Sequence, residues 1–489
     1  MESTPLLATQ PKRHLGVVSA VFLNLNRIIG TGIFSIPGGI YSLTGSVGWS
    51  LVLWSLGAII VLSGFSVYLE YGLEMPHSGG EMNYLSRVYK KPKYLATVTY
   101  AMVVFILEFS ATNAYAFGLY VQLVFGVEDP SVQLSRYIAC VTVIVICAIH
   151  TVYPTLGKNA FNLLGFFKVI TLLIISSLGL AVLTGLWELP NKPNNFDNLF
   201  GNDGIGGGAY NYATALLRIS YSYRGWETIN SVLGEVKNPH RTMLIAGPTS
   251  ILLTVLLYFL CNLAYFAVIP KDQILDAGAI IAGKFFSVLF GESAAAKILP
   301  LCVCLSNIGN ILVVSFACAR VVAELGNHHI VPFSDTFASL KPYGTPLAGL
   351  ALHAVSTCLV VLIPPQGQVY EFIVDLSTYP VSVIALAITI GLVYLHFNAR
   401  ECNWGTGDSK WRSPLVLTSI FLLVNLYMVI APWIPPSEPT TGLPYYSYPL
   451  GSVCVFAASV LYWVYWRNTK NREKFEMRLV RLHATNDGW

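Results

Sequence analysis

The feature that most constrains this chain is a succession of apolar runs of about 20 residues or more, the length at which an α-helix crosses the ~30 Å hydrocarbon core of a bilayer. Of the 489 residues, 54% are hydrophobic and only 11% are charged. Soluble domains are about one quarter charged, so this chain lacks the polar surface that would keep it in water. The sequence therefore predicts an all-α membrane protein.

We expect twelve transmembrane helices, connected by mostly short loops that leave no room for a separate soluble domain. Their approximate ranges are 15–40, 47–73, 95–126, 136–153, 159–185, 209–234, 242–268, 294–323, 346–364, 369–397, 413–434 and 447–467.

The positions of Lys and Arg predict the orientation, because the cytoplasmic loops of membrane proteins carry an excess of these residues. Twenty of the 29 fall in segments on the side of the N-terminus, and five fall on the opposite side. We therefore expect a cytoplasmic N-terminal tail (1–14) and a cytoplasmic basic tail (468–489) that faces solvent and anionic lipid. A plasma-membrane location is expected, but Glu2, Leu6 and Leu7 fit a dileucine sorting signal, which keeps a vacuolar or endosomal location open.

Two of the expected spans are interrupted. In the first, Gly30 and Gly32 lie one residue apart at mid-membrane, and in the sixth, polar residues and Gly225 occupy the stretch from Ser220 to Glu227. A glycine costs a helix roughly 1 kcal/mol relative to alanine, and a charge at mid-bilayer costs ~2.5–3.5 kcal/mol. Glycines can instead serve close helix packing. The breaks, however, fall in the first members of two consecutive five-helix sets, as in inverted-repeat transporters.

The unwound backbone predicts the chemistry of the substrate. Unwinding near Gly30 and Gly32 exposes N–H groups, which favour an anion, and unwinding near Ser220 to Tyr223 exposes carbonyls, which suit a cation. An α-amino acid zwitterion carries one charge of each sign. We therefore expect a small amphoteric substrate such as an amino acid between the two breaks.

At these residues the sequence resembles the amino acid–polyamine–organocation superfamily, and within it the L-type amino-acid transporters and fungal methionine permeases. The resemblance covers the first ten spans. The motifs that carry it are Ile28-Ile29-Gly30-Thr31-Gly32-Ile33-Phe34, Tyr68-Leu69-Glu70-Tyr71-Gly72 with Pro76-His77-Ser78-Gly79-Gly80-Glu81, Gly225-Trp226 followed by Asn230, and Glu235-Val236-Lys237-Asn238-Pro239-His240-Arg241.

The resemblance implies a LeuT-type fold with a five-plus-five inverted repeat. Its ten-helix core would cover 15–397, with repeats at about 15–185 and 209–397, and helices eleven and twelve (413–467) would lie outside it. The substrate carboxylate would bind backbone near Thr31, and the ammonium group would meet carbonyls near Ile28 and Ser222, under Tyr221 as an aromatic gate. The expected substrate-binding residues are Ile28, Ile29, Gly30, Thr31, Gly32, Ile33, Tyr221, Ser222, Tyr223 and Glu227.

Lys168 lies within the fifth span. It could snorkel toward the cytoplasmic face. The resemblance implies instead that its ammonium replaces a sodium ion of sodium-coupled relatives, bound to a helix-one carbonyl near Gly30 and to helix eight. The helix-eight candidates are Ser315 and Cys318, because the paired hydroxyls typical of the family are missing here.

Arg224 and Glu227 depart from the pattern of L-type carriers. At positions i and i+3 they could form a salt bridge. Alternatively, Glu227 faces the cavity and titrates, which would suit proton-coupled uptake. Glu108 in the third span is a further buried carboxylate, for which pairing with a neighbouring helix is the simpler expectation.

The resulting hypothesis is a sodium-independent secondary transporter of neutral, fairly large L-amino acids that works by exchange or uniport through alternating access. Two alternatives stay open: a proton-coupled methionine permease, and an amino-acid sensor that does not transport. No catalytic, metal or cofactor constellation is visible, so an enzyme is not expected. The loop Val127 to Ser135 has no cysteine, so no disulfide-linked heavy subunit is expected either.

Overall fold

The computed structural model describes residues 16–76, 80–107, 109–191, 193–201, 205–231, 233, 236–291, 294–364, 369–405, 411–436 and 443–485. The expected N-terminal tail with its dileucine pattern and Glu108 lie outside these residues.

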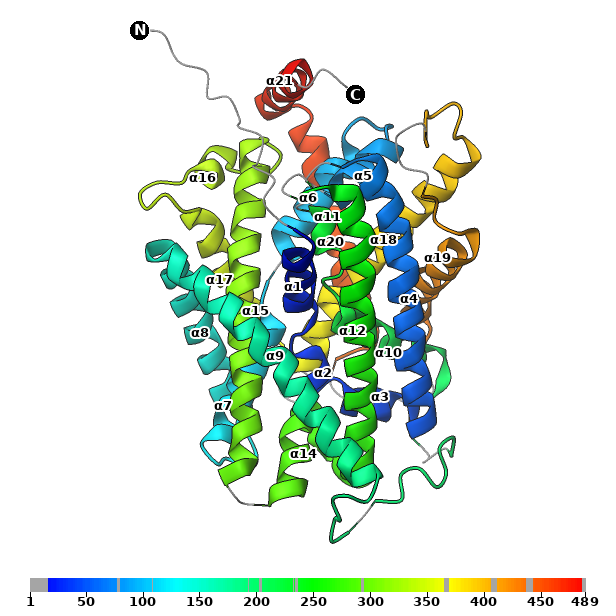
Figure 1. Cartoon of the computed structure of the whole chain (residues 1–489). Coiled ribbons are helices and arrows are strands. Elements are labelled where there is room, and N and C mark those ends of the chain that lie inside the picture. The colour runs from blue at the N-terminus through cyan, green and yellow to red at the C-terminus, as the bar shows by residue number, and fades with distance from the viewer. Residues whose placement is uncertain are drawn as a thin grey trace.

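The elements in this part of the chain are helices, and eleven helical segments are long and apolar enough to cross a membrane (Figure 1). They are α1–α2 (Val17–Ser35), α4 (Val47–Glu74), α6–α7 (Leu95–Val124), α8 (Val132–Val152), Leu163–Leu183 of α9 (Pro154–Leu183), α12 (Pro239–Val268), α13–α14 (Lys271–Phe290), α15 (Ala294–Asn327), α18 (Val369–Phe397), α19 with η3 (Leu415–Trp433) and α20 (Ser447–Trp466). Ten of them coincide with expected spans, so an integral membrane protein is confirmed.

Two expected spans form shorter helices. The sixth is α10 (Gly208–Tyr223), which the second break ends, and the ninth is α17 (Leu347–Leu362). Each has 16 residues, which makes a helix of about 24 Å, short of the ~30 Å hydrocarbon core.

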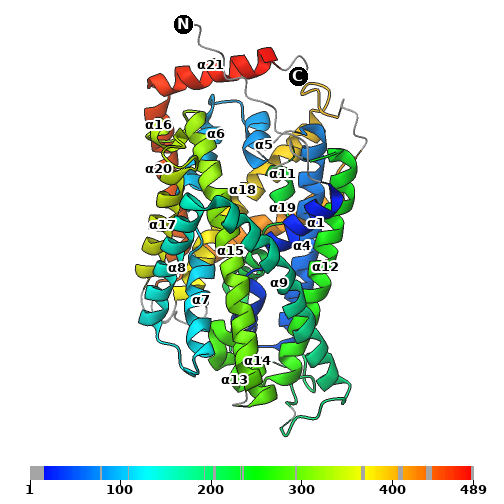
Figure 2. The same ribbon diagram turned by 60° about the vertical axis from the view of Figure 1, so that its left-hand side comes forward.

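The segment Lys271–Phe290, which lies between the seventh and eighth expected spans, is helical. It consists of α13 (Lys271–Ala277), the short η2 (Gly278–Ile280) and α14 (Ile281–Phe290). Gly278 has a φ of +48°, which only glycine adopts readily, and it separates the pieces. Both helices lie at the end of the bundle that is opposite α21 (Figure 2), so neither piece crosses the bundle.

The spans form one bundle with α2 inside it (Figure 1). The short helices α5 (Glu81–Val88) and α16 (Ser334–Ala338) lie at one end, and α3 (Pro37–Thr44) lies at the other. All four residues of α2 (Gly32–Ser35) are buried. The breaks are therefore enclosed by protein, which is where irregular backbone is tolerated at membrane depth.

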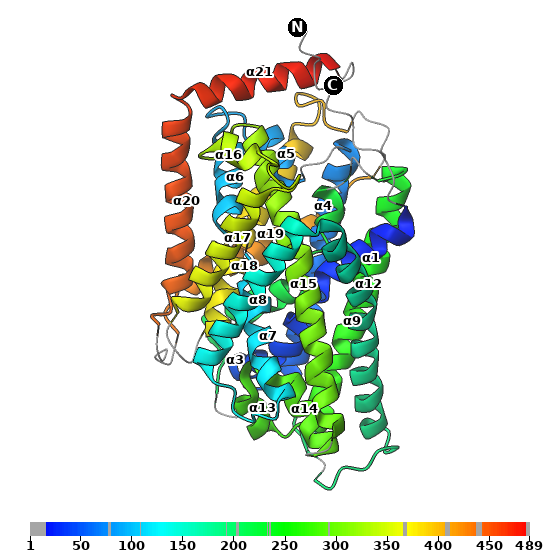
Figure 3. The same ribbon diagram turned by 90° about the vertical axis from the view of Figure 1, so that its left-hand side faces the viewer.

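The basic C-terminal tail is helical over α21 (Lys470–Thr485), which lies across the end of the bundle (Figure 3). The Phe475 ring packs on Tyr94 and Trp466, with centroids 5.1 and 5.7 Å apart. Lys93 Nζ lies 2.8 Å from Glu476 Oε1. These contacts fix the first half of the tail helix against the bundle.

Candidate functional site between two broken helices

The first break lies between α1 (Val17–Ile28) and α2. Ile29 has an extended ψ of 99°, and helical bonding resumes at Gly32. Gly32 is required here, because a Cβ would come within 2.7 Å of Ser222 Cα on α10. This glycine therefore permits the two interrupted segments to touch.

The second break follows Tyr223 and precedes α11 (Thr228–Ser231). Arg224 is extended at φ −60° and ψ 138°, and Gly225 has a φ of +123°. A Cβ on Gly225 would lie 2.8 Å from the backbone carbon of Arg27, so the second break also contacts the end of α1.

A cavity of about 70 Å³ lies between the two breaks. Its walls come from α1, α2, α6, α7, α10, α15 and α18, and from both breaks. They consist of Arg27, Ile28, Gly30, Thr31, Gly32, Leu107, Phe109, Thr112, Asn113, Tyr221, Ser222, Arg224, Asn310, Val314 and Ser377. Of the ten expected substrate-binding residues, Ile28, Gly30, Thr31, Gly32, Tyr221 and Ser222 line this cavity.

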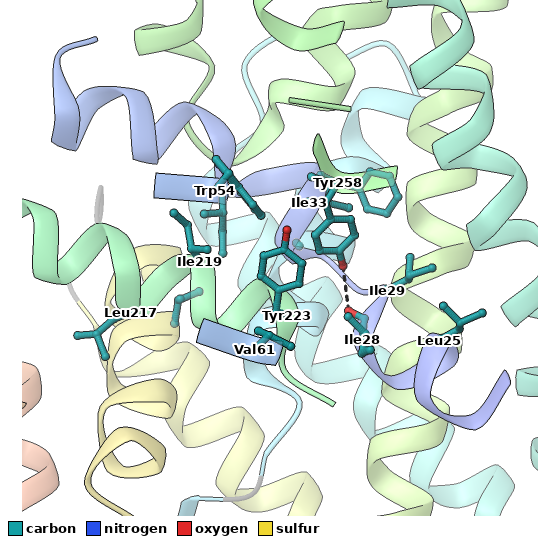
Figure 4. Packing of buried hydrophobic residues seen from close by; sticks show 14 of the residues in the cluster. Leu25, Ile28, Ile29, Ile33, Trp54, Val61, Leu217, Ile219, Tyr223 and Tyr258 are labelled. Atoms are coloured by element: carbon teal, nitrogen blue, oxygen red, sulfur yellow. Dashed lines mark hydrogen bonds between the residues drawn. The ribbon is translucent and has the colours of Figure 1, made fainter. Parts of the chain in front are cut away.

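The other four expected residues do not line it. Ile29, Ile33 and Tyr223 are buried in the apolar core around the breaks, where Tyr223 packs edge-on against Trp54 at 5.8 Å (Figure 4). Glu227 faces a second cavity.

The backbone donors of the first break are only partly satisfied. The Thr31 N–H donates to Asn113 Oδ1 at 3.3 Å, whereas the N–H groups of Gly32 and Ile33 have no acceptor among the described residues. Asn113 and Asn310 flank this backbone: a Cβ on Gly30 would lie 2.2 Å from Asn310 Nδ2. Sequence reasoning missed both amides, since an isolated Asn in an apolar span does not reveal which break it faces.

The carbonyls of the breaks are capped by Tyr258 on α12. Its hydroxyl lies 3.0 Å from the Ile28 carbonyl oxygen (Figure 4) and 3.1 Å from the Ser222 carbonyl oxygen, so its one proton can be donated to either break. Its ring packs on Tyr223, with centroids 5.1 Å apart. These are carbonyls that we expected to receive a substrate ammonium group. No local pattern in 242–268 singles out Tyr258.

Lys168 is buried, and its Nζ donates to the carbonyl of Asn26 at 3.0 Å. Asn26 lies on α1 four residues before Gly30. On α15 the contact is at Gly309, whose Cβ would lie 3.5 Å from Lys168 Cε. Ser315 instead donates to the Ile311 carbonyl of its own helix at 2.7 Å, and Cys318 is buried on the same helix.

Comparison with known proteins shows the family of the chain. The sequence profile of the amino acid permease family matches residues 15–465. The chain belongs to the amino acid permease family. The permease is 36% identical to the high-affinity methionine permease of Saccharomyces cerevisiae over 466 residues, 94% of this chain and 79% of that protein. It is 30% identical to the low-affinity methionine permease of the same yeast (95% and 84%) and 27% identical to the mouse b(0,+)-type amino acid transporter 1 (89% and 85%).

The permease has a second cavity, of about 60 Å³, beside the first. It lies between α4, α10, α18, α19 and the second break, and Arg224 lines both cavities. Its lining residues are Ile60, Val61, Tyr68, Glu81, Ser220, Arg224, Trp226, Glu227, Thr378, Val381, Ser382, Ala385, Phe421, Asn425 and Met428.

Arg224 and Glu227 do not form the salt bridge that was one of the two expectations. Glu227 Oε2 accepts a hydrogen bond from the Gly225 N–H at 2.9 Å, and Arg224 Nη1 reaches the Ser377 carbonyl at 3.5 Å. The positive φ of Gly225 turns the chain between the two residues, so they are not on one helical face.

A buried ion pair joins α10 to α18 in this permease. Arg218 Nε and Nη2 bind the two carboxylate oxygens of Asp375 at 3.0 and 2.9 Å. The paired geometry matches the planar guanidinium to the carboxylate. Arg218 lies one helical turn before Ser222, so the pair ties the helix that carries the second break to its neighbour.

Proposed function

We propose that this permease carries neutral, fairly large L-amino acids across a membrane by alternating access. The observation that carries the proposal is the cavity at the two breaks, with Gly32 in its wall and with N–H groups of Gly32 and Ile33 that have no acceptor among the described residues. These donors suit a carboxylate. The carbonyls of Ile28 and Ser222 suit the ammonium group once the Tyr258 hydroxyl moves away.

The proposed architecture is a twelve-span LeuT-type fold with repeats at about 15–185 and 209–397. Here α10 and α17 supply the two spans that are too short to be recognised from length alone. Both termini lie in the cytoplasm. The permease lies in the plasma membrane, with the vacuolar membrane as the alternative location. The permease works without a disulfide-linked heavy subunit, because its loop between α7 and α8 has no cysteine.

Sodium independence follows from Lys168. Its Nζ donates to the Asn26 carbonyl of the first broken segment, and in its protonated form it supplies a positive charge there. A bound sodium ion beside it would be repelled. The permease therefore exchanges amino acids or carries them as a uniporter in this proposal.

Uptake of radiolabelled methionine, leucine and phenylalanine into proteoliposomes of the purified full-length permease tests the proposal. We expect substrate-dependent flux that is equal in sodium and choline media and is stimulated by internal amino acid. No flux of any neutral amino acid would defeat the transport proposal. Saturable binding without flux would indicate the sensor instead.

A proton-coupled methionine permease is the second candidate. Two observations favour it: the likeness to the yeast methionine permeases over nearly the whole chain, and the position of Glu227 in a cavity beside the substrate cavity. Accumulation of methionine that is driven by an inward proton gradient would distinguish this candidate from exchange and from uniport.

A further inference from the structure

The second cavity contains a group of titratable side chains that the amino-acid site does not use. Glu81, the first residue of α5, lines it together with Tyr68, Arg224 and Glu227. The Tyr68 hydroxyl donates to Glu81 Oε1 at 2.5 Å. The remaining lining residues, from α4, α10, α18, α19 and the second break, carry no charge. Glu81 and Glu227 thus face one small space that contains a single guanidinium group.

Glu81 is surrounded by ionisable groups from four directions. These are Tyr68 from α4, Tyr84 from its own helix, Tyr100 from α6, and the opposite charges of Arg224 and Glu227 from the second break. Burial raises the pKa of the Glu81 carboxyl, and the negative charge of Glu227 raises it further. The hydrogen bonds from Tyr68 and Tyr100 and the charge of Arg224 lower the pKa by less, so it lies above its ordinary value. The carboxyl is therefore able to take up a proton.

The nearby carboxylate of Glu70 is arranged differently. It has no exposed surface and accepts hydrogen bonds from His396 Nε2 at 2.8 Å, Trp404 Nε1 at 2.9 Å and the Ser413 N–H at 2.8 Å. So many donors hold it as a structural anion that joins α4 to the segment after α18. Glu81 instead has the phenol donors Tyr68 and Tyr100, and it lines the second cavity.

Arg224 connects this cavity to the amino-acid site, because its side chain is part of the wall of both. When Glu81 is charged, two carboxylates share the guanidinium and its positive potential is largely compensated. When Glu81 is protonated, more of that potential acts on the first cavity, where it favours a substrate carboxylate. Proton binding and amino-acid binding then strengthen one another, and the linkage is reciprocal.

We propose that Glu81 is the proton-binding group of this permease and that Arg224 transmits its protonation to the amino-acid site. The inference rests on the proposed function, in its proton-coupled form. A hydronium ion in the cavity gives its proton to Glu81, where an O–H bond forms as one in the hydronium ion breaks. The proton returns to water after the permease has turned to the other side, with no redox change.

The test uses the full-length permease in proteoliposomes with radiolabelled methionine and an internal pH dye. The wild type is expected to show uptake that rises as the external pH falls, and methionine-dependent acidification of the lumen. Glu81→Gln is expected to retain methionine exchange at equal pH on both sides while losing the acidification and the pH dependence. Glu401→Gln, at an exposed carboxylate in the segment after α18, is the matched control and should retain all three.

Two charge variants test the electrostatic link independently of folding. Glu227→Gln removes the like charge beside Glu81, so the pH of half-maximal uptake should fall. A shift of about one pH unit or less is expected for Glu227→Gln, because the two carboxylates line the same cavity. Arg224→Gln removes the group that transmits the charge, so uptake should lose its dependence on external pH. A purely structural role of these residues would change the rate and leave the midpoint in place.

The outcomes separate the two proposals. A wild type without any flux defeats the proposed function. A wild type with flux but without pH dependence and acidification overturns the proton site alone, and so does a Glu81→Gln protein that still acidifies the lumen. If Glu81→Gln fails to exchange methionine because it does not fold, a lowered midpoint in Glu227→Gln together with pH-independent uptake by Arg224→Gln decides for the proposal. An unchanged midpoint in Glu227→Gln, or pH-dependent uptake by Arg224→Gln, decides against it.

Discussion

The two breaks in the bundle leave opposite backbone groups, and these groups are not equally available. At the first break, the N–H groups of Gly32 and Ile33 have no acceptor among the described residues. At the second, the carbonyl of Ser222 already shares the Tyr258 hydroxyl with Ile28. The cavity is therefore ready for the anionic end of a zwitterion, whereas the cationic end must first displace a phenol.

The two breaks also differ in what holds them. The first follows a helix that is fixed from outside by the ammonium group of Lys168, through the Asn26 carbonyl. The second break carries two charged residues, Arg224 and Glu227. Arg224 lines both cavities, and Glu227 lines the second one. The first break thus has a fixed support, while the charges of the second can respond to ligands.

Of the substitutions considered, we expect the largest effect on methionine uptake from the loss of Lys168, which supports the first break. Lys168→Ala removes a charged hydrogen bond, worth about 1.5–3 kcal/mol, from the helix that leads into the substrate cavity. Methionine uptake should fall by roughly one to two orders of magnitude. The measurement is initial uptake in sodium and in choline media, and no sodium dependence should appear.

Lys341→Ala, at an exposed lysine, serves as the control for this variant and should transport normally. Wild-type flux from Lys168→Ala would contradict the proposed role of the ammonium group as a substitute for sodium.

A direct way to disturb both breaks is Gly32→Ala. The new Cβ would lie 2.7 Å from Ser222 Cα, a backbone atom that cannot rotate away. Overpacking of this kind costs about 1–3 kcal/mol, so uptake should fall roughly tenfold. Gly16→Ala adds the same methyl group where no atom lies within 4 Å, and uptake should be unchanged. Similar activities of the two variants would mean that the breaks separate more widely than the structure shows.

The features that could be predicted from the sequence are those that depend on neighbouring residues in the chain. The position of the first break was predicted correctly, because two glycines one residue apart weaken a helix whatever its packing partners are. The second was expected from Ser220 onward, yet α10 continues to Tyr223, since polar side chains inside a protein bundle do not by themselves end a helix. Gly225, with its positive φ, marks the actual turn.

The parts of the site that the sequence did not predict depend on packing between segments that are distant in the chain. Tyr258, Asn113 and Asn310 reach the breaks from α12, α7 and α15, and nothing in their own neighbourhoods predicts a partner. Lys168 was expected to meet a carbonyl near Gly30 and meets that of Asn26, one turn earlier on the same helix. A residue type thus predicts which kind of group it binds, whereas the position of the partner depends on how the helices are set against one another.

Tyr258→Phe addresses the capped carbonyls and should give the smallest effect. It removes a hydroxyl that donates to both breaks, which should lower the free energy of unfolding by about 0.5–1.5 kcal/mol. The freed carbonyls should bind the substrate ammonium group more readily, so KM should fall severalfold. Thermal unfolding and uptake kinetics measure the two effects.

Tyr265→Phe is the matched control for that substitution. Tyr265 lies two turns further along α12, and its buried hydroxyl has no hydrogen-bond partner among the described residues. Its removal should leave KM unchanged and should not lower the free energy of unfolding. A KM that rises in Tyr258→Phe would instead show that the phenol helps to bind the substrate.

The ion pair between Arg218 and Asp375 constrains which movements the bundle can make. Separating a buried, bidentate pair leaves two charges without compensation, at a cost of about 3–5 kcal/mol. An opening that slid the Arg218 turn of α10 along α18 would have to meet that cost in every cycle. An opening in which α10 and α18 move together as one rigid body would keep the ion pair intact and avoid this cost. The least costly hinge therefore lies outside the pair, at the stretch around Gly225.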